Sequence, residues 1–492
     1  MLTRITLAAL LGATLLPAQT IPDRPEKLTY KTLTFTPPKA KDHFVTLANG
    51  MSAYLLEDPT GQPLVTFRVL IKGGTYLDAP GKEGATHLMG EILDSSGTKT
   101  LNADQLSEKL ETLAARVSST INTTQGFLQM NLMEKDAQEG LELFRDLLTQ
   151  PAFQQDRIDL VKKQMRQNIE RRNDDTTSIE RYQFGFLTLG ENYYTNRQET
   201  AASLDAITRE DLLALHARLL HPKNLILSVS GRFDRKAMIK TLNTTLGAIK
   251  PTAQAKLSEK IPTPDHQIKP GIYVCEKDVN QGRVSIALPG LRRSDPDWHA
   301  VTVMNFILGG DFTSRLVMKI RTEEGLAYNV QSSFSPGPFF RGDFRAAFQT
   351  KVRTVAYGTR LALAELERIR TAPVSDEELA MAKGALVDRF PSNFSSTAAV
   401  ASMFAQEEYM ADAPNYYATY RDKIQAITKA DIQRVAQKYL TPEKAAILVV
   451  GGKAADLEEG DVKDHPGKLS EVAKLPVVKL PLRDPLTLKP LK

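Results

Sequence analysis

The chain has 492 residues, of which 42% are hydrophobic, so it can bury the cores of several domains and global disorder is excluded. Its 63 basic and 58 acidic residues leave a formal net charge of +5. No dense basic block is present, which argues against nucleic acid as a partner. The single cysteine excludes an internal disulfide framework and any cysteine-based zinc site.

The N-terminus has the layout of a secretory signal peptide, assigned to residues 1–18. Arg4 supplies the positive start, and an apolar run of twelve residues follows from Ile5 to Leu16. A mitochondrial presequence or a buried helix would fit less well, because there is only one arginine and the apolar run is uninterrupted. The mature chain is therefore expected to be exported, either to a periplasm or out of the cell. It is expected to begin with an extended arm over residues 19–40 and to have no membrane span.

Hydrophobic periodicity and turn signals predict the elements that follow. The Asn49-Gly50 pair predicts a hairpin between His43 and Asp58. The other predicted elements of the first half are strands at 64–71 and 126–133, helices at 84–93 and 103–115, and long helices across 136–189. Further along, the run 271–275 reads as a strand in which Cys275 is a small buried apolar residue.

An internal repeat indicates that the chain contains two related domains. Residues 207–231 recur as residues 427–451 without a gap, at a constant offset of 220. Each copy reads as a helix, a proline turn and a buried strand that ends in glycine. Thr208 and Thr428 occupy equivalent helix N-cap positions. The match predicts two homologous α+β domains.

Composition sets the predicted domain limits. The segment 251–270 is rich in proline and polar residues, which is typical of a linker. The N-terminal domain is therefore assigned to 41–250 and the C-terminal domain to 271–453. The Lys/Pro-rich tail over 454–492 reads either as an ordered strap or as a flexible end.

Two motifs resemble the insulinase/pitrilysin family, which includes the mitochondrial processing peptidase subunits and bacterial two-subunit relatives. One is the run 84–98, GATHLMGEILDSSGT, and the other is the string that begins at Gly309-Gly310 and ends at Tyr328. The resemblance covers nearly the whole mature chain. It implies an α+β fold of two homologous domains, each a mainly antiparallel sheet flanked by helices.

Active members of this family carry His-x-x-Glu-His on a helix, where two histidines bind zinc and the glutamate is the general base. In this chain, His87 matches the first histidine, but Gly90 stands at the base position and Glu91 at the second histidine position. Glycine cannot act as a base, and in mid-helix it costs about 1 kcal/mol relative to alanine, so packing or a kink must compensate. We therefore expect a structural helix, with His87 as a hydrogen-bonded interior or cleft histidine.

The third zinc ligand of active relatives precedes an acidic pair, which here is Asp174-Asp175. Alignment on that pair puts Asn168 at the ligand position, and Glu170 is the only nearby carboxylate. A variant metal site built from His87, Glu91 and Glu170 remains an alternative, because histidine and glutamate are legitimate zinc ligands. The expectation is nevertheless no metal cofactor in this chain.

The second motif keeps the residues that hold the peptide carbonyl in active relatives. The resemblance assigns this role to Arg321 and Tyr328, and it suggests substrate contacts for Gly309, Gly310 and Ser314. A helix is predicted over 314–324, capped by a glycine, with a strand over 326–334. The alternative is that Arg321 caps its own helix and Tyr328 packs under the sheet.

Three functions follow from this split pattern. The favoured one is a non-zinc subunit of an exported zinc peptidase, which supplies Arg321 and Tyr328 to a heterodimer. Its partner would be a homologous chain with an intact His-x-x-Glu-His motif and bound zinc, and its substrate would be a peptide. The alternatives are an inactive structural or peptide-binding homologue, and a self-sufficient metallopeptidase with a variant zinc site.

Overall fold

The computed structural model describes residues 24, 28, 35–337, 339–411, 413, 415–460 and 467–491. The predicted signal peptide and most of the predicted arm lie outside these residues. The chain divides into two compact units, residues 1–36 and 37–492, and every element below belongs to the second unit. Among the described residues, no helix has both the length and the apolar character needed to cross a membrane.

The first half of the chain builds a six-stranded sheet that is mainly antiparallel. Its spatial order is β1 (Phe44–Thr46), β2 (Ser52–Glu57), β6 (Leu225–Gly231), β3 (Leu64–Lys72), β5 (Gln125–Met133) and β4 (Arg116–Ile121). Only β2 and β6 run parallel. The predicted hairpin at Asn49-Gly50 is confirmed as β1 and β2, whereas the edge strand β4 was not predicted, because its polar sequence RVSSTI carries little apolar alternation.

The second half repeats this arrangement. Its sheet has the order β12 (Val477–Leu480), β7 (Gly271–Cys275), β11 (Ala446–Val450), β8 (Gln281–Pro289), β10 (Asp343–Lys351) and β9 (Val330–Ser335). The order from β7 to β9 matches the order from β2 to β4, and this match confirms the predicted fold of two related sheet-and-helix domains. The sixth strands differ, since β1 is antiparallel to β2 and β12 is parallel to β7.

The repeat detected in the sequence folds in the same way in both halves. Thr208 and Thr428 each accept a hydrogen bond from the backbone N–H of the aspartate three residues later, which completes a capping box. These residues begin the helices α8 (Arg209–Leu219) and α15 (Lys429–Tyr439). A 3₁₀ turn that starts at proline then leads each chain segment into its buried strand, β6 or β11.

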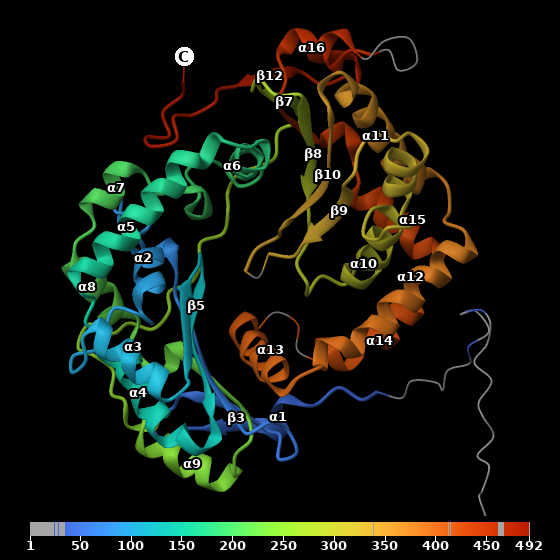
Figure 1. The fold of residues 1–492 in the computed structure, drawn as a ribbon. Coiled ribbons are helices and arrows are strands. Elements are labelled where there is room, and N and C mark those ends of the chain that lie inside the picture. The colour runs from blue at the N-terminus through green and yellow to red at the C-terminus, as the bar shows by residue number, and fades with distance from the viewer. Residues whose placement is uncertain are drawn as a thin grey trace, which may run out of the picture. The chain divides into compact units, whose positions relative to one another are not determined.

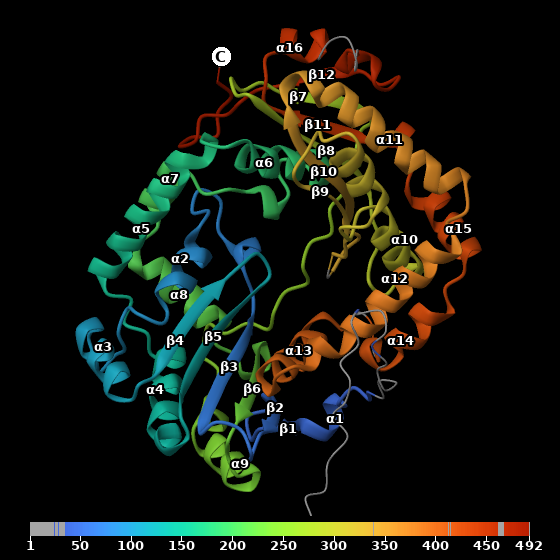
Figure 2. The same ribbon diagram turned by 45° about the vertical axis from the view of Figure 1, so that its right-hand side comes forward.

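Helices cover the sheets. Those of the first half are α1 (Ala40–His43), α2 (Ala85–Ile92), α3 (Ala103–Thr112), α4 (Ala137–Thr149), α5 (Gln155–Glu170), α6 (Thr176–Leu189), α7 (Ala201–Ala206), α8 and α9 (Arg235–Thr244) (Figure 1). Those of the second half are α10 (Trp298–Leu308), α11 (Val355–Thr371), α12 (Asp376–Arg389), α13 (Thr397–Met410), α14 (Tyr416–Ala426), α15 and α16 (Ala454–Glu459) (Figure 2). The largest buried cluster fills the space between the first sheet and its helices, with Phe67 and Phe144 among its fully buried side chains.

The two halves exchange one helix each. Helix α13 from the second half packs on β2, β3 and β6 of the first sheet (Figure 2). Phe404 is buried there against Tyr54. Helix α6 from the first half packs on β8 and β11 of the second sheet. Its Glu180 is 1% exposed and pairs with Arg345 on β10 at 2.5 Å. This exchange holds the two halves together by both apolar and charged contacts.

The C-terminal tail is an ordered strap in its described part. After β12 has paired with β7, the chain returns to helices of the first half. The carbonyl of Pro481 accepts a hydrogen bond from Gln183 on α6, and the carbonyl of Arg483 accepts one from Asn173. The sequence left a strap and a flexible end as alternatives, and these contacts favour the strap over residues 467–491.

Candidate functional site

The helix that resembles a zinc helix, α2, begins at a buried carboxylate. Gly84 is its N-cap and has a left-handed backbone with φ +97°. Asp78 accepts hydrogen bonds from the N–H of Gly84 at 3.0 Å and of Thr86 at 2.9 Å. Burial raises the pKa of Asp78, although the bonds from Thr86 act in the opposite direction. The carboxylate thus satisfies the first N–H groups of the helix and fixes its position.

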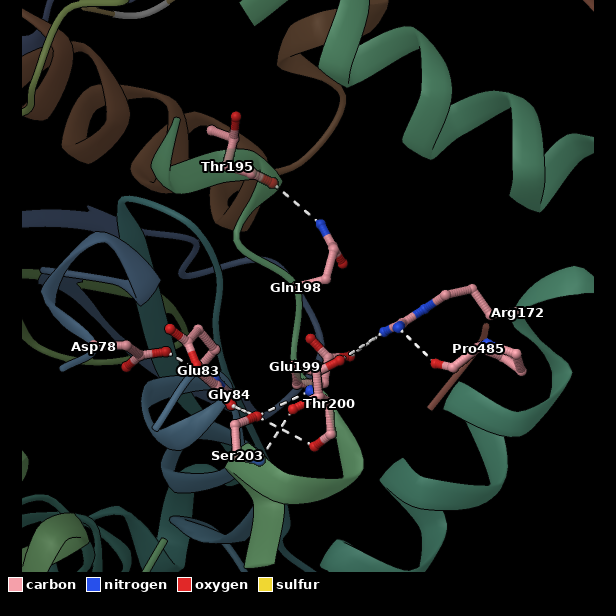
Figure 3. Close-up of polar contacts among 10 residues, drawn as sticks. All are labelled: Asp78, Glu83, Gly84, Arg172, Thr195, Gln198, Glu199, Thr200, Ser203 and Pro485. Carbon is pink, nitrogen blue, oxygen red and sulfur yellow. Dashed lines mark hydrogen bonds and ion pairs between the residues drawn. The ribbon is translucent and has the colours of Figure 1, made fainter. Parts of the chain in front are cut away.

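A polar network lies behind this helix (Figure 3). The hydroxyl of Ser203 on α7 donates to the carbonyl of Glu83, just before α2. The guanidinium of Arg172 is 4% exposed and donates to the carbonyls of Glu199, at 3.0 Å, and of Pro485, at 2.9 Å. The tail therefore helps to position the segment that leads into α7 and, through Ser203, the start of α2.

His87 and Glu91 lie on one exposed face of α2. The His87 Nε2 is 3.7 Å from the Glu91 Oε1, and the two side chains are 41% and 42% exposed. The hydroxyl of Thr120 on β4 donates to the same Glu91 oxygen at 3.2 Å. The half-exposed ring shows that His87 is not an interior histidine, and the alternative of a hydrogen-bonded cleft histidine stays a prediction.

Gly90 lies where α2 touches the edge strand β4. A Cβ placed on Gly90 would be 2.3 Å from the backbone nitrogen of Ile121 and 2.9 Å from the carbonyl carbon of Thr120. The Ser119 hydroxyl also donates to the Gly90 carbonyl at 2.6 Å. Close helix–strand packing therefore requires glycine here and compensates for its low helix propensity. A general base at this position would need the helix and strand to separate.

The remaining metal-ligand candidates do not complete a site. Asn168 and Glu170 are exposed near the end of α5. Throughout the described ranges, no group of three or more His, Cys, Asp or Glu side chains is arranged to hold a metal ion. Within those ranges, His87, Glu91 and Glu170 do not come together as such a group, and the absence of a metal cofactor stays a prediction.

Arg321 projects from a distorted helix. The segment η8 (Val317–Glu323) is a π-helix, not the regular helix predicted over 314–324. The N–H of Glu324 bonds to the carbonyl of Lys319, and Gly325 then takes a left-handed backbone with φ +63° and ends the helix as predicted. Single-turn π segments are frequent at functional sites. The predicted strand over 326–334 begins only at Val330.

The Arg321 guanidinium lies between two exposed aromatic rings. Its central carbon is 5.2 Å from the centre of the Phe312 ring and 5.1 Å from the centre of the Tyr328 ring. Phe312 is 74% exposed and Tyr328 is 87% exposed, so Tyr328 does not pack under the sheet. Both stacks restrain the guanidinium without using its N–H donors. The tertiary structure therefore brings Arg321 and Tyr328 together, as their spacing predicted.

Phe312, Arg321 and Tyr328 line a cavity of about 570 Å³. Gly309 and Gly310 form one wall, and Gly309 also packs closely on β9, since a Cβ there would lie 2.5 Å from the Ser332 hydroxyl. Ser314 is only 3% exposed, so a substrate contact through its hydroxyl would require movement of the loop. The neighbouring Arg315 forms two hydrogen bonds to Glu378 on α12, at 2.7 and 2.9 Å, and anchors the start of η8.

Sequence reasoning missed Phe312 as a member of this site. It lies in the quoted second motif, but a single aromatic residue in a glycine-rich loop carries no periodic signal. Its ring becomes informative only beside Arg321. Phe312 and Tyr328 are large exposed side chains that line one cavity, and such exposed apolar surface indicates a site of interaction.

Two protein-family models match the chain. Residues 54–184 match the family model described as insulinase, peptidase family M16, and residues 206–386 match the one described as peptidase M16 inactive domain. The chain is 25% identical to the non-peptidase homolog YmxG of Helicobacter pylori over 80% of this chain and 90% of that protein. It is 21% identical to an uncharacterized zinc protease of Streptomyces coelicolor over 78% and 84% of the two chains.

The fold also matches solved structures. The crystal structure of a peptidase M16 inactive domain from Pseudomonas fluorescens superposes with a TM-score of 0.74 at 22% identity. The match covers 83% of this chain and 98% of that one. At this level of identity, the similarity establishes the fold alone.

Proposed function

The chain belongs to the insulinase family of peptidases, family M16, and from this membership we propose that it is a non-zinc subunit of an exported zinc peptidase. In this proposal, Arg321 and Tyr328 bind the peptide carbonyl in a heterodimer. A second M16 chain with an intact His-x-x-Glu-His motif supplies the zinc and the general base.

Membership of an inactive branch of the family is the coarser part of this function. The family model matched over 206–386 is described as an inactive domain, and one relative is named a non-peptidase homolog. Both support an inactive M16 member. The packing of Gly90 against β4 supplies a physical reason, because a base has no room there while the helix and strand stay in contact.

The observation that carries the heterodimer proposal is the stacking of Arg321 between Phe312 and Tyr328 at the cavity of about 570 Å³. A guanidinium and a phenol are strong donors suited to charge that develops on a carbonyl oxygen. Their exposure leaves them available to a substrate held partly by another chain. A peptide could add as a strand beside β4, which is the edge of the first sheet.

Reconstitution tests this function. The mature chain is mixed with an M16 chain of the same organism that has an intact motif, and cleavage of a quenched fluorescent peptide library is followed. We expect cleavage only with both chains, and Arg321→Lys should lower kcat while complex formation in gel filtration is unchanged. Arg353→Lys is the matched control, since Arg353 is exposed and pairs with Glu459 at 3.4 Å. Equal turnover with Arg321→Lys would refute the assigned role.

A purely structural or peptide-holding role is the second candidate. It is favoured by the relative named a non-peptidase homolog. Under this alternative, the two chains associate or bind peptide without cleavage in any combination. The same reconstitution separates the two functions, because cleavage by the complex excludes this one.

A further inference from the structure

A second cavity, of about 310 Å³, lies between the first sheet and the exchanged helix α13. We call it the α13 cavity. Residues from both halves line it, namely Arg68, Phe127, Arg293, Gln406, Glu407 and Tyr417. None of them belongs to the cavity of Arg321. Ligand sites occur preferentially where two domains meet, and this volume is at the lower end of their range.

Arg68 brings a positive charge into this cavity without a counter-ion. Its guanidinium carbon lies 3.8 Å from the centre of the Phe127 ring, and its Nη1 donates to the neutral Gln129 side chain at 2.8 Å. Burial lowers the pKa of Arg68, and no carboxylate among the described residues counters this shift. A partly buried guanidinium without an anion is costly, so an anion from outside the chain would be stabilising here.

Two further charged side chains in the cavity each have one buried atom without a hydrogen-bond partner. The Arg293 guanidinium lies 4.7 Å from the centre of the Tyr416 ring, and its buried Nε has no acceptor. Glu407 has a buried Oε1 without a donor. Burial raises the pKa of Glu407, although Arg293 opposes the shift. Buried polar groups in folded proteins are almost always paired, so these groups in one cavity call for a missing partner.

The charges decide which partner fits. The two guanidiniums outweigh one carboxyl group, so the lining is net positive. A guanidinium offers a planar fork of N–H donors that matches a carboxylate. The amide side chains of Gln125 and Gln406, hydrogen-bonded to each other at 2.8 Å, lie beside them and can serve the polar groups next to a carboxylate.

We propose that the α13 cavity is a binding site for a carboxylate group, held by Arg68 and Arg293. The carboxylate could come from a peptide C-terminus, an acidic side chain or a small organic acid. The proposal does not rest on the heterodimer, because binding is expected in the chain alone.

The only tryptophan of the chain provides an internal reporter. The Trp298 Nε1 lies 3.3 Å from the hydroxyl of Tyr416. The Tyr416 ring in turn contacts the guanidinium of Arg293. The mature chain is titrated with acetyl-Ala-Ala, its C-terminal amide, acetyl-Glu-amide and glutarate, and both tryptophan fluorescence and calorimetry are recorded. Saturable binding of at least one carboxylate probe, and none of acetyl-Ala-Ala-amide, is expected. The carboxylate probe that binds most tightly identifies the source.

Variants link the binding to the cavity. Arg68→Gln and Arg293→Gln should each weaken binding about tenfold or more, since a hydrogen bond to a charged group is lost. Arg293→Lys keeps the positive charge but loses the planar set of N–H donors. It replaces Arg293→Gln if that variant does not fold. Arg232→Gln is the control, because Arg232 follows β6 on the surface and pairs with Glu134 at 3.2 Å. Three results would each overturn the proposal: no carboxylate probe binds, the amide binds equally well, or the control loses as much affinity.

Discussion

Helix α2 and the edge strand β4 meet at Gly90 and Ile121, where an added Cβ would lie 2.3 Å from the Ile121 backbone nitrogen. In active relatives a general base occupies the Gly90 position. The loss of the base and the close approach of the strand are therefore one structural feature. The short distance indicates that any side chain at position 90 will cost stability.

Gly90→Ala should destabilise the protein by roughly 1–3 kcal/mol, because the added methyl group overlaps backbone atoms. Gly384→Ala is the matched control, since Gly384 also lies inside a helix, α12, and nothing lies within 4 Å of its added Cβ. The control should gain about 0.5–1 kcal/mol from the better helix propensity of alanine. Urea unfolding measures both, and a Gly90→Ala variant as stable as the wild type would contradict the packing argument.

The degenerate helix leads to a prediction about metal. Because His87, Glu91 and Glu170 are not assembled into one group, the purified mature chain should contain negligible zinc after gel filtration in zinc-containing buffer. Elemental analysis gives the answer directly. About one zinc per chain, lost in His87→Ala, would contradict this prediction and support the variant zinc site.

Two substitutions at Tyr328 separate its hydroxyl from its ring. Tyr328→Phe keeps the ring stacked on Arg321 and removes only the donor, so it should lower kcat of the reconstituted complex by about a hundredfold with little change in KM. Tyr328→Ala also removes the ring and should raise KM as well, because Arg321 loses one of its two stacking partners. Wild-type kinetics in Tyr328→Phe would mean that the hydroxyl has no role, and identical kinetics for the two variants would mean that the ring has no role of its own.

Arg172 tests the contribution of the C-terminal strap. Arg172→Ala removes the hydrogen bonds to Glu199 and Pro485 and leaves two partly buried carbonyls without that donor, at a cost of about 2–3 kcal/mol. Arg171→Ala is the control, because Arg171 is the exposed neighbour in the same turn. Thermal unfolding compares the two. A protease should also cleave the tail faster in Arg172→Ala, and equal stability of both variants would argue against the strap.

Asp343 predicts a pH dependence of stability. Burial raises its pKa to about 6, with Glu180 acting in the same direction and Arg345 in the opposite one. Between the unfolded pKa near 4 and the folded value, the folded state binds more protons, so this group makes stability fall as pH rises through that window. The contribution is at most about 3 kcal/mol.

Asp343→Asn should therefore raise stability at pH 7.5 and change it little at pH 4. Urea midpoints at the two pH values measure the difference. Asp265→Asn, at an exposed position in the linker, serves as the control. A variant that is less stable than the wild type at pH 7.5 would show that the ionised carboxylate of Asp343 is stabilising.

The sequence by itself determined the duplication, the fold class and the two family motifs. These follow from local signals, namely the offset of 220, the capping threonines, the buried strands and the spacing of seven between Arg321 and Tyr328. It also identified the missing base at Gly90. Each of these is carried by residues close together in the chain, so a pattern can reveal it.

Only the tertiary structure decided the rest. The contact of Gly90 with Ile121, the stacking of Phe312 on Arg321, and the exchange of α6 and α13 join residues that the sequence separates. The α13 cavity likewise combines Arg68 with Glu407, more than three hundred positions apart. No periodic or local signal encodes such pairs, because their energy comes from packing and desolvation that exist only in the folded chain.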